Sequence, residues 1–300
     1  MKVALTGATG FLGGQVLEQL LLAGHTVRAL TRRPQPERRG VSWISGSLDD
    51  DDGLARLCAG AAIVVHVAGV VKSYDREAFV RGNVTGTQRL VQAASAADVS
   101  GFVHVSSLAA REPRLSAYGA SKAQSEDVVR AAGLPHAIVR PPAIYGPGDV
   151  DHLELFRFAK LGVMPLPACG RLSVIHVTDM ARLVAALVGQ QLAGQLYEAD
   201  DGRANGWAHG EFAQAIARAV GRRAVTLPLP AVAIKAAARL DGLMRGDQAR
   251  LTPDRAAYFA HPDWVIEPAR RPPAALWHPI VETGQGLGST AAWYRERGLL

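Results

Sequence analysis

A tyrosine and a lysine four residues apart, Tyr118 and Lys122, have the side chains best suited to moving a proton. Ser116 has the side chain of a helix N-cap, and a four-residue spacing on the following helix puts the phenol and the ammonium on one face. A phenol has an ordinary pKa of about 10, too high for a base near neutrality, and a neighbouring cation lowers it. Ser106 and Ser107 end a predicted strand and could hydrogen-bond a substrate oxygen as charge develops on it. The pattern predicts acid–base chemistry at a hydroxyl or a carbonyl.

A glycine turn near the N-terminus makes that pattern more specific. Gly7, Gly10 and Gly13 lie between an apolar run over residues 2–5 and a helical pattern that starts at Phe11. Such glycines permit a tight turn and let the backbone approach a pyrophosphate, while the helix N-terminus offers N–H groups to the anion. Glycines alone often mark only a turn, but these open the first strand–helix–strand unit. They predict a dinucleotide site that includes Gly7, Thr9, Gly10, Phe11, Leu12 and Gly13.

The end of the second predicted strand distinguishes the two nicotinamide dinucleotides. A carboxylate there accepts the ribose hydroxyls of NAD, whereas an arginine accommodates the extra phosphate of NADP. This chain has Arg32 and Arg33 at that point, and no acidic residue occurs between Glu18 and Glu37. Guanidinium groups bind phosphate in a bidentate manner. We therefore predict NADP(H) rather than NAD(H) as the cofactor, the alternative being a solvated basic loop.

Short apolar runs alternate with helical patterns along the first 200 residues. The runs over residues 26–30, 41–45, 63–68, 102–106 and 137–140 lack polar alternation, which predicts a parallel sheet covered on both faces. Residues 174–177 and 195–199 are expected as strands that return to this sheet around a helix over 178–189. We predict an α/β Rossmann fold with a doubly wound parallel sheet and a smaller, discontinuous C-terminal substrate domain. The expected bounds are 1–147 and 171–200 for the NADP-binding domain, and 148–170 and 201–300 for the substrate-binding domain.

With these motifs in place, the chain resembles the extended, epimerase/dehydratase-like branch of the short-chain dehydrogenases/reductases over roughly residues 1 to 200. The resemblance implies that Ser107 donates a hydrogen bond to the substrate oxygen and that Tyr118 is the acid/base. It implies that Lys122 binds the cofactor ribose and tunes Tyr118, and that Asn83 supports the geometry of the site. The segment 140–148 resembles the family's segment beside the nicotinamide, and 177–181 its later helix start. Further cofactor-binding positions are expected at Ser47, Leu48, Ala68, Gly69, Val70, Ser106, Tyr118, Lys122, Pro141, Ala143 and Ile144.

One position departs from the family pattern. Where relatives have an aspartate that meets the adenine amino group, this chain has Ser47, which could still accept that hydrogen bond. The acidic run 49–52 is interpreted as the solvated start of a helix, where acids are favoured, and no metal site is expected. His66 and His104 lie within apolar strands and are interpreted as core histidines with satisfied hydrogen bonds rather than as catalysts.

The C-terminal region is basic. Residues 218–255 have a net charge of +5, and Pro230 is expected to start a helix that has an apolar stripe, with Lys235, Arg239 and Arg245 elsewhere on it. An apolar groove with a basic collar would suit a lipid met at an anionic membrane surface, whereas the alternative is an ordinary amphipathic helix that closes the domain core. The apolar stripe is Ala233, Ala236, Ala237, Leu240, Leu243 and Met244.

Composition bounds the function. The chain has 300 residues, a formal net charge of +6 and 6% aromatic residues, and it lacks the motifs and aromatic–basic interleaving of nucleic-acid binders. Cys58 and Cys169 form no disulfide framework and no zinc-ligand spacing, and no run approaches the ~20 apolar residues of a spanning helix, so we expect a cytoplasmic protein, membrane-peripheral at most.

With its segments 251–254 and 261–264, the C-terminal region resembles that of bacterial lipid-modifying members of this branch, the ketosphinganine or ceramide reductases. The function ranked first is therefore an NADP(H)-dependent oxidoreductase acting on a lipid-like carbonyl, keto-sphingolipid, ceramide or steroid-like. The second is a nucleotide-sugar epimerase or dehydratase, and the third a non-catalytic NADP-binding sensor or assembly subunit. The family resemblance also makes a homodimer plausible through the helices that flank Asn83 and Tyr118.

Overall fold

The computed structural model describes residues 1–246 and 251–300, which form two compact units. Unit 1 comprises Met1–Pro141, Met180–Glu198 and Arg270–Trp277, and unit 2 comprises Pro142–Asp179, Ala199–Ala269 and His278–Leu300. These bounds differ from the expected ones at residues 142–147, 171–179 and 199–200, which belong to unit 2, and at residues 270–277, which return to unit 1. The return is anchored where the Glu198 N–H donates to the Arg270 carbonyl at 3.0 Å. The binding roles expected for the two units stay predictions.

Unit 1 is built on a seven-stranded sheet with the order β11-β6-β5-β4-β1-β2-β3, in which every neighbouring pair is parallel. The order reverses direction between β1 and β4, and in open α/β sheets ligands bind in the crevice beyond the carboxyl ends of the strands at such a point. The predicted doubly wound sheet is confirmed. Its strands are β1 (Lys2–Thr6), β2 (Thr26–Thr31), β3 (Val41–Ser45), β4 (Ile63–His66), β5 (Gly101–Val105), β6 (His136–Val139) and β11 (Gln195–Tyr197).

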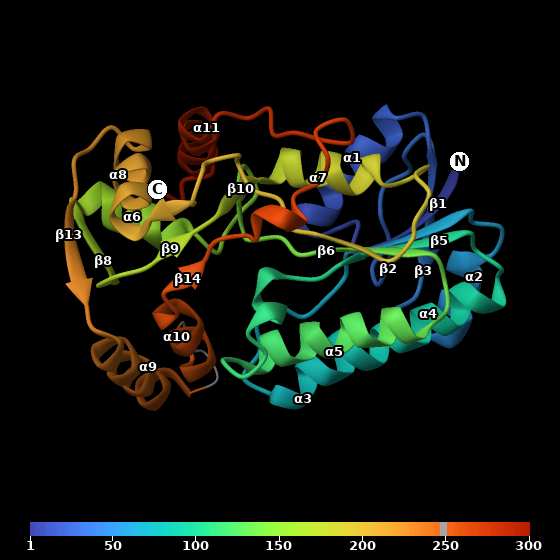
Figure 1. Ribbon diagram of the computed structural model, residues 1–300, viewed down its shortest axis with the longest axis horizontal. Helices are drawn as coiled ribbons and strands as arrows, with labels where there is room; N and C mark the ends of the chain where they lie inside the picture. Colours follow the sequence, from blue (N-terminus) through green and yellow to red (C-terminus); the bar gives the residue numbers. More distant parts are fainter. Residues whose placement is uncertain (247–250) are drawn as a thin grey trace. The chain divides into compact units, whose positions relative to one another are not determined.

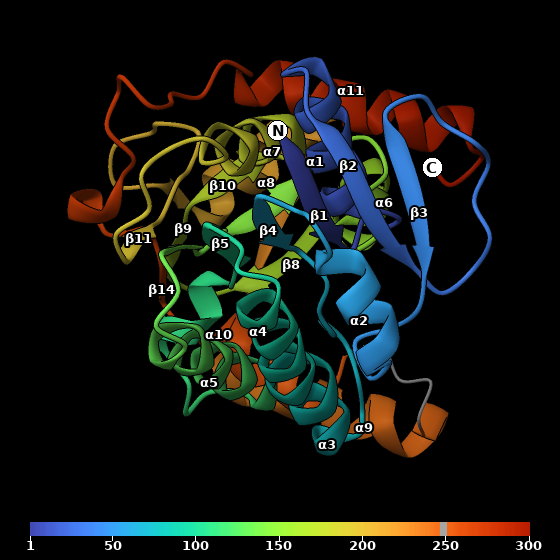
Figure 2. The ribbon, with the colours of Figure 1, turned by 90° about the vertical axis from the view of Figure 1, so that its right-hand side faces the viewer.

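Helices cover both faces of this sheet (Figures 1 and 2). α2, α4 and α5 lie on one face, where Leu57, Leu90 and Val129 pack against Val64 and Phe102. α1 and most of α7 lie on the other. The helical segments are α1 (Phe11–Leu22), α2 (Asp51–Cys58), α3 (Arg76–Phe79), a π-helical segment (Val80–Thr85), α4 (Gly86–Ala96), a 3-10 turn (Leu108–Arg111), α5 (Ala117–Ala131) and α7 (Val177–Ala186).

The acidic run 49–52 and the apolar run 174–177 can be compared with what the sequence predicts for them. The acidic run does start a helix, because the Asp50 carboxylate accepts a hydrogen bond from the Gly53 N–H and α2 begins at Asp51. The run over 174–177, however, does not join the large sheet. It forms β10 (Val174–His176), which pairs in parallel with β7 (Ala143–Tyr145) in a separate two-stranded sheet of unit 2.

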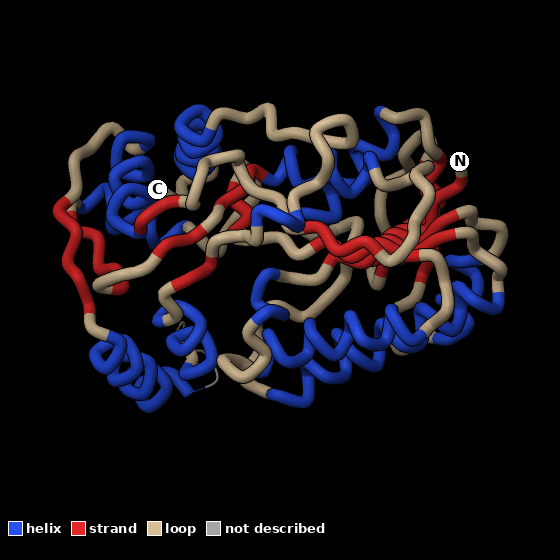
Figure 3. The backbone as a smooth tube through the Cα atoms, in the orientation of Figure 1, coloured by secondary structure: helices blue, strands red, loops and turns tan. Residues whose placement is uncertain are grey.

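Unit 2 consists of helices and short strands around its own core (Figure 3). Phe156, Met164, Phe212 and Tyr294 are buried at its centre. Its other elements are α6 (Leu153–Leu161), β8 (Val163–Pro167), β9 (Arg171–Leu172), β12 (Trp207–Ala208), α8 (His209–Ala219), β13 (Val225–Leu229), α9 (Ala231–Arg245), α10 (Pro253–Ala260), β14 (Asp263–Trp264) and α11 (Thr283–Glu296), with a 3-10 turn, Pro268–Arg270, at its boundary. Within the described ranges, no helix is both long and apolar enough to cross a bilayer.

Candidate active site

The glycine turn forms a cradle that larger residues would fill. Gly7 has φ +79°, and a Cβ there would lie 2.7 Å from the Ala68 nitrogen. A Cβ on Gly13 would lie 1.9 Å from the Gly7 carbonyl oxygen. Gly10 caps α1 without a side chain and the first turn has no acidic residue, so the helix N-terminus is suited to an anion. The turn therefore fits the pyrophosphate of a dinucleotide.

The loop after β4 runs beside this turn. The Thr6 hydroxyl accepts a hydrogen bond from the Ala68 N–H at 3.2 Å, which ties the loop to the end of β1. A Cβ on Gly69 would lie 2.9 Å from the Asn83 Oδ1 and 3.8 Å from the Lys122 Nζ. The structure thus brings Ala68, Gly69 and Val70 together with the predicted catalytic side chains.

Asn83 holds that loop to the helix that carries the tyrosine. Its Oδ1 accepts from the Val70 N–H at 2.7 Å, and its amide nitrogen donates to the Val70 carbonyl and the Ser121 hydroxyl, each at 2.9 Å. The side chain is buried and lies in the π-helical segment Val80–Thr85, a helix distortion that occurs frequently at functional sites. This bridging is the supporting geometry that the family resemblance implies for Asn83.

Lys122 is 4% exposed, and its ammonium donates to the Val105 carbonyl at 2.8 Å. Burial lowers the pKa of Lys122 to about 8, against the opposing attraction of the Glu126 carboxylate. Tyr118 begins the same helix, which Ser116 caps by accepting from the Gly119 N–H at 2.9 Å, as predicted. The Tyr118 ring is half-buried, and its centroid lies 6.0 Å from that of Phe79. The helix therefore presents a positioned phenol one turn from a buried cation.

The two serines after β5 play different parts. The Ser107 Oγ accepts a hydrogen bond from the Ala109 N–H at 3.2 Å, which leaves its proton able to go to a substrate oxygen. The Ser106 hydroxyl instead donates to the Glu126 Oε1 at 2.6 Å. The structure therefore favours Ser107 over Ser106 as a donor to the substrate.

Beneath these residues lies a buried ion pair that the sequence analysis missed. Arg140 binds Glu126 in a bidentate manner, with both nitrogen–oxygen distances 2.8 Å, and also approaches Glu198 at 3.4 Å. Burial alone would raise the pKa of Glu126, yet the hydrogen bonds from Arg140 and Ser106 hold it below its ordinary value. The available signal was spacing, because positions 118, 122 and 126 share one helix face.

Replacing Glu126 by glutamine is expected to lower the free energy of unfolding by about 3–5 kcal/mol, because the buried Arg140 loses its bidentate partner and keeps only the longer contact with Glu198. Urea denaturation followed by circular dichroism measures this. The control is Asp127→Asn on the same helix, whose side chain is 75% exposed and pairs with Arg130, with an expected change of at most about 0.5 kcal/mol. Equal losses in the two variants would contradict a structural role for the buried pair.

The predicted NADP residues lie at neighbouring strand ends. Arg32 and Arg33 are exposed just after β2, where the Thr31 hydroxyl donates to the Arg33 carbonyl at 2.6 Å. On the adjacent strand end, the Ser47 hydroxyl donates to the Asp49 carboxylate. This hydrogen bond and, more weakly, the Arg32 charge lower the pKa of Asp49. Ser47 thus keeps an oxygen that can accept, as the predicted adenine contact requires.

The remaining predicted positions divide between the two units. Leu48 packs against Gly86, where an added Cβ would lie 3.0 Å from the leucine Cβ. The Pro141 carbonyl accepts from the Leu108 N–H at 2.8 Å in unit 1. Ala143 and Ile144 belong to β7 of unit 2.

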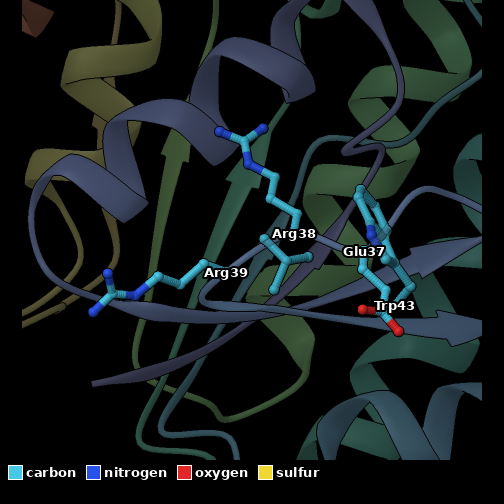
Figure 4. A pocket seen from close by; sticks show the side chains of 5 residues that line it. Glu37, Arg38, Arg39 and Trp43 are labelled. Atoms are coloured by element: carbon cyan, nitrogen blue, oxygen red, sulfur yellow. The ribbon is translucent and has the colours of Figure 1, made fainter.

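A separate hollow of about 560 Å³ lies beside β3, the edge strand next to β2 (Figure 4). Its lining residues precede and begin β3, so it lies toward the amino end of that strand and away from the glycine turn. Arg38 is held there by Glu18 at 2.5 Å, and the Trp43 indole donates to the Pro36 carbonyl at 2.9 Å. We assign no chemistry to this hollow, which is lined by Glu37, Arg38, Arg39, Val41 and Trp43.

His66 and His104 lie stacked in the core with ring centroids 5.3 Å apart. His66 is satisfied as predicted, with Thr6 at 2.7 Å and Thr87 at 3.0 Å. His104 bonds Ser125 through Nε2, but its Nδ1 has no hydrogen-bond partner among the described residues, so the expectation of a satisfied histidine is wrong for this residue. Burial, and to a smaller extent the Lys122 cation, lowers the pKa of His66 to about 3 and that of His104 in the same direction.

These pKa shifts predict acid sensitivity. Both rings are neutral in the folded protein, whereas the unfolded chain takes up protons as the pH falls below 6.5, so stability falls with pH in that range. Between about pH 7.5 and about pH 5, His66 alone is expected to remove about 2 kcal/mol from the free energy of unfolding, and His104 acts in the same direction. Urea denaturation of wild type and His66→Gln at both pH values isolates this contribution, because the amide does not titrate. An unchanged pH dependence in the variant would count against it.

Comparison with known proteins places the chain in a family. The profile of the NAD dependent epimerase/dehydratase family matches residues 3–199. The chain is 38% identical to a ceramide reductase of Caulobacter vibrioides, over 99% of this chain and 96% of that protein. A 4-hydroxy-2-methyl-3-oxo-4-farnesyl-3,4-dihydroquinoline-1-oxide ketoreductase of Stigmatella aurantiaca is 28% identical over 67% of this chain and 69% of its own.

The fold is also found among solved structures. MoeE5 in complex with UDP-glucuronic acid and NAD is similar with a TM-score of 0.75 and 21% identity, over 99% of this chain and all of the other. The predicted fold class and family resemblance are thereby confirmed. The chain belongs to the NAD-dependent epimerase/dehydratase family, an extended branch of the short-chain dehydrogenases/reductases, and is an enzyme of that family.

Proposed function

We propose that this enzyme uses NADPH to reduce a ketone on a long-chain lipid, keto-sphingolipid, ceramide or steroid-like. The observation that carries the reductase chemistry is the position of Tyr118 on α5, one helical turn before the buried Lys122. The lipid class is supported by the similarity to a ceramide reductase along nearly the whole chain.

The residues fit a nicotinamide dinucleotide. The glycine turn would hold the pyrophosphate, and Lys122 would bind the ribose next to Gly69. Arg32 and Arg33 would contact a ribose phosphate, which favours NADP over NAD. When bound, the cofactor supplies the hydride that reaches the carbonyl carbon.

The chain's own groups handle the proton and the developing charge. Ser107 donates a hydrogen bond to the substrate oxygen, which becomes more basic as the carbonyl is reduced. Tyr118 then gives its phenolic proton to that oxygen. The Lys122 ammonium stabilises the phenolate left behind, and Asn83 keeps the helix and the loop after β4 in register.

Turnover of defined substrates tests this function. Purified enzyme is given NADPH with a ceramide that carries a ketone on its long-chain base, or with UDP-glucose, and the loss of reduced nicotinamide is followed by absorbance. We expect oxidation with the keto-lipid and none with the sugar nucleotide. Conversion of the sugar to an epimer or a dehydrated product would make the enzyme an epimerase or dehydratase instead. Tight NADPH binding without turnover of any ketone would favour a sensor or assembly subunit.

Several finer expectations belong with this proposal. A lipid substrate would be met at a membrane surface by a cytoplasmic enzyme, and the helices that flank Asn83 and Tyr118 would form the interface of a homodimer. Light scattering of the purified protein measures its mass and thereby tests the homodimer. A monomeric mass at micromolar concentration would contradict it.

A further inference from the structure

Helix α9 exposes an unusual number of large apolar side chains. Val232 is 79% exposed, Leu240 58%, Leu243 85% and Met244 76%. Together with the exposed Ala236, we call these residues the α9 apolar face. Scattered single apolar residues are normal on protein surfaces, but a group on one helix marks an interaction site.

The face is continuous around the helix axis. At 100° per residue, its members fall within a sector of about 120°. The buried residues Ile234 and Ala238 lie on the other side of the helix, where they pack with Ala256 of the neighbouring α10 (Figure 1). The helix therefore has two apolar sides, of which one builds the local core and the other faces outward.

Positive charges border the outward side. Lys235 and Arg239 are exposed and lie next to the α9 apolar face on the helical wheel. The segment 218–255 carries a net charge of +5 in the sequence. Apolar residues bordered by cations complement the acyl boundary and the phosphates of an anionic bilayer.

We propose that α9 docks this enzyme on the surface of an anionic lipid bilayer, with the α9 apolar face at the boundary between headgroups and acyl chains. Lys235 and Arg239 then lie at the level of the lipid phosphates. A protein partner is less well matched, because lysine is depleted in the cores of protein interfaces. The inference rests on the proposed function for its purpose, which is access to a membrane lipid, but docking itself needs no turnover.

Vesicle binding of the full chain tests the proposal. Sucrose-loaded vesicles of equal parts phosphatidylglycerol and phosphatidylcholine are sedimented with the protein, beside vesicles of phosphatidylcholine alone. We expect binding to the anionic vesicles that weakens as salt rises, and at least about tenfold weaker binding to the neutral ones. Failure to bind the anionic vesicles at low salt would overturn the proposal.

Matched variants separate the helix from general surface hydrophobicity. The triple variant Leu240→Ser, Leu243→Ser and Met244→Ser is expected to reduce the partition coefficient at least about tenfold. The control replaces Leu22 and Leu161 by serine, since these leucines are 79% and 77% exposed outside α9. Lys235→Glu with Arg239→Glu should abolish the preference for phosphatidylglycerol. An equal loss in the control, or no loss in the triple variant, would overturn the assignment to α9.

Two further measurements distinguish the other outcomes. If the α9 apolar face joins two copies of the chain, light scattering will show a dimer that the triple variant converts to monomer, and the membrane proposal falls. If the enzyme reduces no keto-lipid but the wild type still binds anionic vesicles through α9, the proposed function falls and the docking stands. If the proposed function and the docking through α9 are both correct, the triple variant will lose turnover of a keto-lipid in vesicles. It will keep turnover of a short, water-soluble ketone.

Discussion

Replacing Tyr118 by phenylalanine is expected to lower kcat about 10²–10⁴-fold, because the substrate oxygen loses its proton donor. The change removes one oxygen atom from the first turn of α5 and leaves the Ser116 cap and the Lys122 ammonium in place. Binding of NADPH, measured by fluorescence titration, should therefore change little. We therefore expect kcat to fall while the affinity for NADPH stays the same.

The structure offers a matched control for this change. Tyr294 is buried in unit 2, and within the part of the chain that the structure describes its hydroxyl has no hydrogen-bond partner. Tyr294→Phe makes the same chemical change at a residue outside the predicted catalytic and cofactor-binding set, and we expect its kcat to equal that of the wild type. Retention of activity in Tyr118→Phe would remove the acid/base role and favour a non-catalytic function.

Replacing Arg32 and Arg33 together by alanine is expected to weaken NADPH binding at least about 100-fold. Hydrogen bonds to charged groups contribute about 1.5–3 kcal/mol each, and two guanidinium groups would contact the ribose phosphate. Binding of NADH, which lacks this phosphate, should change by no more than about threefold, so the preference between the cofactors collapses. Parallel titrations with the two reduced cofactors measure this.

Arg38 and Arg39 provide the control for charge alone. They line the hollow toward the amino end of β3 (Figure 4), whereas the predicted phosphate position lies at the carboxyl end of β2, so alanine at both removes the same net charge without touching that position. NADPH affinity should fall only slightly, through long-range electrostatics. Similar losses in both double variants would show that overall charge, rather than a specific contact, attracts NADPH. Equal affinities of the wild type for NADPH and NADH would contradict the predicted preference.

Local sequence patterns were sufficient to predict most of the helices, strands and turns. The strand, glycine turn and helix at residues 2–22 could be predicted because glycine spacing and apolar periodicity are local properties. The same holds for the Ser116 cap and for Tyr118 and Lys122 on one helix face. Local patterns also predicted the helix that starts after Pro230, because proline and an apolar period mark such a start.

Contacts between distant residues were decided only in the folded chain. The bidentate pair of Glu126 with Arg140 joins α5 to the residue after β6, and a lone glutamate on a helix looks like a solvated charge. Residue types alone left the two serines after β5 equivalent, and only the family resemblance singled out Ser107. In the folded chain Ser106 donates to Glu126, whereas the Ser107 hydroxyl keeps a proton that it can donate to a substrate. Strand pairing was also decided only in the folded chain. β10 has the residues of a buried strand, as predicted, but it pairs with β7 and not with the large sheet.

The apolar stripe of α9 was likewise predicted in part from the sequence and decided in part by the folded chain. Its period is evident from residue types, but which side of α9 is buried depends on Ala256, which approaches from α10. A helix period fixes the angle between side chains and not the direction in which each face points. The sequence by itself thus determined the helices and strands of the first unit and the glycine turn, and it placed Tyr118 and Lys122 on one helix face, where their chemistry stays a prediction. Only tertiary packing decided which charges are buried in pairs and which apolar face stays in solvent, because burial is set by residues far apart in the chain.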